Sequence, residues 1–164
     1  MQITSFRDMY LAELQELLSV ERQLAGALPL MAEVASQPEL KRALLQHQHE
    51  THVQKERLQS IVVKHGADPD AHQDQAMHAL VNETRKMMEM LKGNELRDAG
   101  LIASVQKLAH YEIAAYGTAC ALAGQLDLRD DQRTLHASLD EARAADAKLT
   151  ELAKGKVNAQ ALAS

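Results

Sequence analysis

Aromatic residues and turn-forming residues are scarce in this sequence. Its 164 residues include no Trp, one Phe and three Tyr, and only seven Gly and three Pro. Hydrophobic residues nevertheless make up 46%, so the core must be aliphatic and tight turns must be few. This composition indicates an all-α fold, and the length is usual for a single domain.

The sequence also lacks disulfide pairs, long apolar runs and clustered charge of one sign. Its one cysteine, Cys120, excludes an intrachain disulfide. No stretch approaches the roughly 20 apolar residues of a membrane span, and the N-terminus does not resemble a signal peptide. The net charge is −5, with Lys and Arg scattered singly. We therefore expect a cytoplasmic protein with neither membrane nor nucleic-acid partners.

Hydrophobic periodicity predicts four long amphipathic helices and one shorter helix. The long helices are expected over about residues 5–35, with a disturbance at Pro29, and over 39–65, 95–126 and 130–153, and the shorter helix over 77–91. Residues 1–154 would form the domain, and residues 155–164 a frayed tail. Short turns make the first two and the last two long helices antiparallel, while the middle connection is long. We predict a ferritin-like four-helix bundle whose crossover contains an additional helix.

Glutamate interrupts the hydrophobic seam of two predicted helices. In the first helix the seam runs through Tyr10, Leu14, Leu17, Glu21, Leu24, Leu28 and Met31. In the third long helix it runs through Leu101, Val105, Leu108, Glu112, Ala115, Ala119, Leu122 and Leu126. One buried carboxylate can be accidental, but carboxylates on separate helices at one level need a shared partner, because isolated buried charges cost several kcal/mol.

The other two long helices supply further polar candidates. The inward half of the second carries His47, Glu50, Thr51 and Gln54, and the fourth carries Glu141. Glu21 precedes Glu50 by 29 residues, and Glu112 precedes Glu141 by the same 29 residues. Two equivalent hairpins would therefore bring four carboxylates to one level. The helical phase around Glu141 is ambiguous, because an alternative seam favours Asp146.

Oxygen-rich sites in helical bundles suit iron or manganese. The usual Glu-x-x-His motif is absent, because Val53 follows Glu50 and Ala144 follows Glu141 at the third position. His47 could instead bind a metal or hydrogen-bond to a metal-binding carboxylate. We place Gln54 behind the ligands, in hydrogen-bonding range of them.

Two tyrosines flank Glu112. Tyr111 and Tyr116 could relay electrons or donate a hydrogen bond near the metals, but packing with a satisfied hydroxyl is the simpler interpretation. We predict that Tyr116 and Asp146, like Gln54, lie beside the metal ligands.

Four segments resemble the YciE/YciF family of bacterial ferritin-like stress proteins: VERQL at 20–24, HETHVQKERL at 49–58, KLAHYEIAAYGT at 107–118 and KLTELA at 148–153. The resemblance implies a ferritin-like bundle, commonly dimeric, with a dinuclear metal site and an activity that is not established. It implies that Glu21, Glu50, Glu112 and Glu141 are metal carboxylates, with His47 and Gln54 at matching positions. The chain departs from the family at His49, Ala109 and Ala142, where acidic residues are usual.

The leading hypothesis is a stress-response protein that binds two metal ions, iron or manganese, and acts on dioxygen or peroxide. The alternative is a homodimeric, metal-binding or structural bundle without turnover. A storage shell is disfavoured, because the sequence shows no additional C-terminal helix for a cage.

Overall fold

The chain folds as a bundle of antiparallel helices. The computed structural model describes residues 2–164, and within this range it contains helices and turns but no strand. The four long helices are α1 (Phe6–Val34), α2 (Pro38–Lys64), α4 (Asn94–Gln125) and α5 (Arg129–Leu152), and the crossover helix is α3 (Gln75–Met90). The predicted four-helix bundle with a helical crossover is confirmed.

Local sequence signals explain where the helices begin and end. Ser5 caps α1 and forms a capping box with Asp8, which satisfies backbone donors at the helix start. Pro38 occupies the first turn of α2, where its missing N–H costs nothing. Gly66 and Gly93 adopt positive φ angles of 71° and 89° at the ends of the crossover, a conformation that glycine tolerates best. The helix α1 continues through Pro29.

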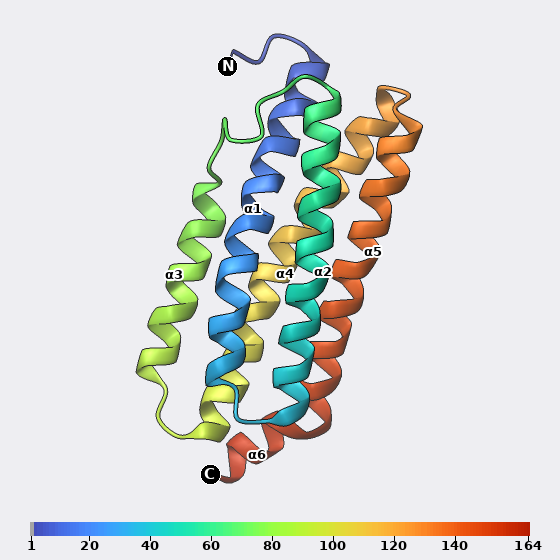
Figure 1. Ribbon diagram of the computed structural model, residues 1–164. Helices are drawn as coiled ribbons and strands as arrows, with labels where there is room; N and C mark the ends of the chain where they lie inside the picture. The colour runs from blue at the N-terminus through green and yellow to red at the C-terminus, as the bar shows by residue number, and fades with distance from the viewer. Residues whose placement is uncertain (1) are drawn as a thin grey trace.

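The two hairpins, α1 with α2 and α4 with α5, pack side by side (Figure 1). Within the bundle α1 also contacts α4, and α2 contacts α5. The crossover helix α3 packs against α4 and α1, so it covers one side of the bundle. The opposite side, along α2 and α5, has no such cover (Figure 1).

Buried carboxylates fix both ends of the bundle. At the α1–α2 turn, the backbone N–H groups of Ser36 and Gln37 donate to the carboxylate of Asp98 on α4 at 2.8 and 2.9 Å. At the other end Asp131 on α5 accepts from Lys64 Nζ at 2.8 Å and lies 2.6 Å from His65 Nε2. Burial opposes ionisation of Asp131, but hydrogen bonds from these two partners lower its pKa overall.

The C-terminal segment differs from the frayed tail that the sequence suggested. Residues Ala153–Val157 form a π-helical turn, and Asn158–Ala163 form a short helix, α6. Val157 is buried, and α6 contacts α4. The single buried valine was too weak a periodic signal to indicate this extension.

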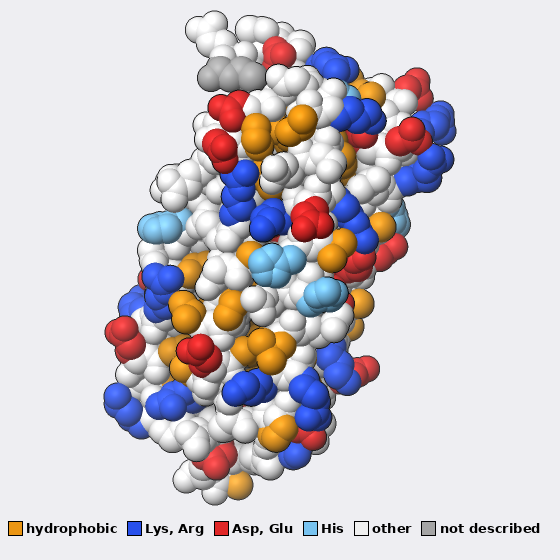
Figure 2. All heavy atoms as spheres, in the orientation of Figure 1, with side chains coloured by type: hydrophobic (Ala, Val, Ile, Leu, Met, Phe, Trp, Pro, Cys, Tyr) orange, Lys and Arg blue, Asp and Glu red, His pale blue; other side chains and the backbone are white. Residues whose placement is uncertain are grey.

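The surface carries mixed charge. On the face shown in Figure 2, acidic and basic side chains are interspersed with histidines and apolar groups. None of the helices described in residues 2–164 combines the length and the apolar character that a membrane span requires.

Candidate metal centre

Two glutamates lie in the dry interior of the bundle. Glu21 on α1 and Glu112 on α4 are both 0% exposed. The Tyr116 hydroxyl donates to Glu21 Oε1 at 2.6 Å, and His47 Nε2 lies 3.2 Å from Glu112 Oε2. The remaining oxygens, Glu21 Oε2 and Glu112 Oε1, have no hydrogen-bond partner among residues 2–164. The sequence-based placement of both glutamates in the core is therefore confirmed.

The surroundings of Glu21 disfavour its ionised form. Burial raises the pKa of Glu21 well above its ordinary value, and the nearby charge of Glu112 raises it further, with a smaller effect from Glu141. Burial also raises the pKa of Tyr116, reinforced by the charges of Glu21 and Glu112. A cation placed between the two glutamates would reverse this preference for the protonated form.

Helix α2 contributes a row of buried polar side chains. His47, Thr51 and Gln54 are exposed by 3%, 0% and 0%. Each has an unpartnered polar atom, namely His47 Nδ1, Thr51 Oγ1 and Gln54 Oε1. Burial lowers the pKa of His47, but the hydrogen bond and charge of Glu112 outweigh burial and raise it overall. An unpaired buried polar group costs about 1–3 kcal/mol, so three on one helix require an explanation.

The other two predicted carboxylates, Glu50 and Glu141, are only partly buried. Glu50 accepts a hydrogen bond from Gln46 Nε2 at 2.8 Å on its own helix. Glu141 accepts from Gln54 Nε2 at 3.0 Å and from Arg57 Nη1 at 2.8 and 2.9 Å. Arg57 thus supplies the counter-charge of Glu141 in this conformation. The sequence analysis missed Arg57, because no spacing pattern links it to α5.

Asp146 lies apart from the buried glutamates. Its carboxylate accepts from Gln106 Nε2 at 3.0 Å and lies 3.1 Å from Nε2 of the exposed His110. It therefore bridges α5 to the outer face of α4. The Asp146 side chain is less exposed than that of Glu141, at 19% against 31%, but it is the charge of Glu141 that acts on Glu21. Gln54 contacts Glu141, and Tyr116 contacts Glu21.

The donor types suit a hard or borderline divalent metal, but they are not gathered as a finished ligand shell. Within residues 2–164 no group of three or more His, Cys, Asp and Glu side chains is arranged to hold a metal ion. Of the seven buried side-chain polar atoms without a hydrogen-bond partner in residues 2–164, five belong to residues of the predicted site: Glu21, His47, Thr51, Gln54 and Glu112. Carboxylate, amide and imidazole donors fit iron or manganese in kind. Completing a site requires side-chain movement, above all at Glu141.

Comparison with known proteins gives a consistent relationship over nearly the whole chain. Residues 5–162 match the family model described as a domain of unknown function, DUF892. The chain is 38% identical to Protein YciF of Escherichia coli K12 over 162 residues, which is 98% of each chain. The crystal structure of the E. coli stress protein YciF superposes with a TM-score of 0.90, covering 95% of this chain and 99% of the other.

A second solved structure, YcfI from Rhodopseudomonas palustris, superposes with a TM-score of 0.87 at 34% identity and covers 91% of this chain and 95% of its own. YcfI is described as a candidate structural protein. The family expected from the sequence segments is therefore confirmed. The chain belongs to the DUF892 family, together with the stress protein YciF.

Proposed function

We propose that this protein binds two metal ions, iron or manganese, between its buried carboxylates and acts on dioxygen or hydrogen peroxide. The observation that carries the proposal is the pair Glu21 and Glu112. Both are fully buried on different helices, and each has an oxygen that, in the part of the chain the structure describes, bonds to no partner; no Lys or Arg of that part bonds to either glutamate. Two divalent cations would neutralise such a pair and satisfy its free oxygens.

Five side chains would hold the metals. Glu21 and Glu112 form the centre, His47 offers the unpartnered Nδ1, and Glu50 and Glu141 supply the outer carboxylates. Glu141 can take this role only after its ion pair with Arg57 opens. Gln54 bonds to Glu141 and would guide that carboxylate as it moves.

Bound metal in the reduced state would supply two electrons, one per ion, to hydrogen peroxide, which with two protons becomes two waters. The protein's own groups prepare this reaction. The Tyr116 hydroxyl orients Glu21 at 2.6 Å, and burial excludes bulk water from both central carboxylates. His47 Nε2, at 3.2 Å from Glu112 Oε2, would fix the orientation of that carboxylate.

A metal-content experiment tests the proposal. The protein is purified without chelator, loaded anaerobically with ferrous or manganous ion and analysed by mass spectrometry for bound metal. Glu112→Gln should lose about half or more of the metal, since it removes a charge at the centre of the site. The matched control is Glu83→Gln on α3, whose side chain is 66% exposed. Equal metal content in both variants would count decisively against the site.

A structural bundle without turnover is the second candidate. It is favoured by the Arg57–Glu141 ion pair, which neutralises one predicted ligand without metal. Ferrous-loaded protein distinguishes the two candidates: an enzyme develops a near-ultraviolet band on exposure to peroxide and recycles with a reductant. Iron that oxidises no faster than free iron in the same buffer would favour the structural role. We extend the proposal to a cytoplasmic homodimer, for which light scattering provides the test of subunit number.

A further inference from the structure

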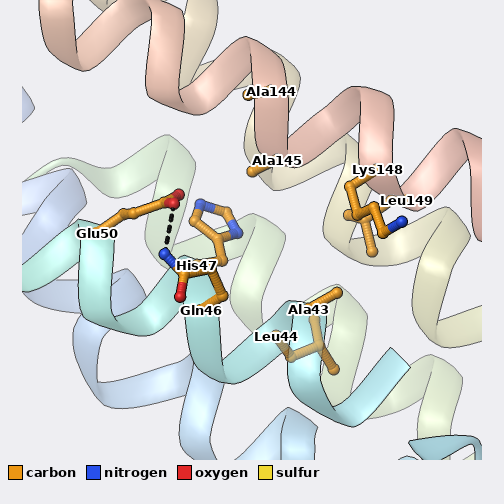
Figure 3. Close-up of a pocket in the computed structure, with 9 residues that line it drawn as sticks. All are labelled: Ala43, Leu44, Gln46, His47, Glu50, Ala144, Ala145, Lys148 and Leu149. Carbon is orange, nitrogen blue, oxygen red and sulfur yellow. Dashed lines mark hydrogen bonds between the residues drawn. The ribbon is translucent and has the colours of Figure 1, made fainter. Parts of the chain in front are cut away.

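A cavity opens between α2 and α5 on the side of the bundle that the crossover helix leaves uncovered. Its volume is about 130 Å³, and its floor includes the buried His47. Figure 3 shows His47 on α2 facing Ala145 on α5 across the opening, with Ala43 opposite Lys148 and Leu149. We propose that this cavity is the entrance by which a small uncharged oxidant, dioxygen or hydrogen peroxide, reaches the buried carboxylates; this inference rests on the function proposed above.

The position of the cavity singles it out among the sides of the bundle. Helix α3 packs on α1 and α4, which closes the approach to Glu21 and Glu112 from that side. On the open side, His47 is 3% exposed, has an unpartnered Nδ1 and bonds through Nε2 to Glu112. A molecule that enters the cavity therefore reaches the His47 side chain, which bonds through Nε2 to a central glutamate, Glu112.

The lining determines which oxidants fit. Alanine methyl groups and Leu149 form most of the wall, while the charged groups are one acid, Glu50, and one base, Lys148. Opposite single charges create no field that selects an anion or a cation. A closed cavity of about 150 Å³ accommodates benzene, so this smaller one admits dioxygen or hydrogen peroxide but not a bulky compound such as cumene hydroperoxide.

Narrowing the cavity from either wall provides the test. Ala145→Leu fills it from α5 and Ala43→Leu from α2, whereas Ala147→Leu adds the same bulk at an exposed position of α5 outside the cavity. Both filling variants should bind as much ferrous ion as wild type but react with hydrogen peroxide at least about tenfold more slowly, the effect of one added group in a close-fitting pocket. The Ala147 variant should react at the wild-type rate, and wild type should prefer hydrogen peroxide to cumene hydroperoxide.

A second measurement needs no metal. Dissolved dioxygen is paramagnetic and accelerates the nuclear relaxation of protons near it. In metal-free protein under oxygen pressure, it should accelerate relaxation of the His47 ring protons more than that of the Ala119 methyl protons. Ala119, on α4, is the buried control and is 0% exposed. Ala145→Leu should reduce the effect at His47. Unchanged rates of reaction with hydrogen peroxide in both filled variants, or equal relaxation at His47 and Ala119, would refute the proposal that this cavity is the entrance. If wild type binds no metal, the proposed function fails, and the relaxation measurement alone decides the inference.

Discussion

Replacing Glu21 with glutamine should remove a pH dependence of the metal-free protein's stability. Burial and the charge of Glu112 raise the pKa of Glu21 in the folded state. Between the unfolded value, about 4.3, and the raised folded value, the native state holds one proton more than the unfolded state. The free energy of unfolding must then fall by about 1.4 kcal/mol per pH unit from this group. The stabilisation is complete below the unfolded pKa and is lost as pH rises through the folded one.

Urea denaturation of chelator-treated protein at pH 5, 6 and 7 measures this slope. Glutamine keeps the shape of Glu21 and can still accept from Tyr116, so the free energy of unfolding of Glu21→Gln should fall less steeply with pH, by up to about 1.4 kcal/mol per pH unit. The variant should therefore be the more stable protein at pH 7 without metal. Glu83→Gln, on the exposed face of α3, should retain the wild-type slope. Identical slopes in wild type and Glu21→Gln would refute the claim that this carboxylate takes up a proton in the apo fold.

Three further predictions concern the metal, Arg57 and the buried Asp131. Chelation should lower the melting temperature clearly at pH 7 and much less near pH 5, where protons replace metal on the carboxylates; calorimetry at both pH values checks this. Arg57→Leu should tighten manganese binding about tenfold or more, since removing about 1.4 kcal/mol of repulsion between the guanidinium and the metal cation suffices. Arg42→Leu, at an exposed site, should leave the affinity unchanged. Titration calorimetry that finds weaker binding in Arg57→Leu would contradict the role of Arg57 as a competitor for Glu141. Asp131→Asn should cost about 2 kcal/mol at pH 7, and because cationic partners hold the pKa of Asp131 low, this cost should shrink as pH falls below about 4. Chemical denaturation measures that cost, and an equal cost at pH 7 and pH 2.5 would argue against an ionised Asp131.

The fold and the two central glutamates could be predicted because they depend on periodicity. A seam of leucines leaves little doubt about which face of α1 and α4 is buried, and Glu21 and Glu112 each stand at its centre. The same reasoning placed His47, Glu50, Thr51 and Gln54 inward on α2; Glu50 is only partly buried, and the other three are buried. A hydrophobic repeat of seven residues reveals the buried face of a helix, because seven residues make about two helical turns.

The rest of the site depends on contacts between helices, which periodicity does not encode. The seam of α5 mixes leucine with serine and alanine, so two phases fit it and periodicity could not decide between Glu141 and Asp146. The length of Arg57 lets it reach across from α2 to Glu141, and no spacing within either helix indicates that. The cavity between α2 and α5 likewise depends on small side chains of two different helices, Ala43 on α2 and Ala144 and Ala145 on α5.

X-ray diffraction from crystals soaked anaerobically in ferrous or manganous ion tests the central claim most directly. Anomalous difference maps at the absorption edge of the metal locate the ions independently of any assumed ligand. The account predicts two peaks between α1 and α4, within bonding distance of Glu21 and Glu112, with Glu141 released from Arg57. Maps with no peak at these glutamates, or with metal bound only at surface histidines, would contradict it.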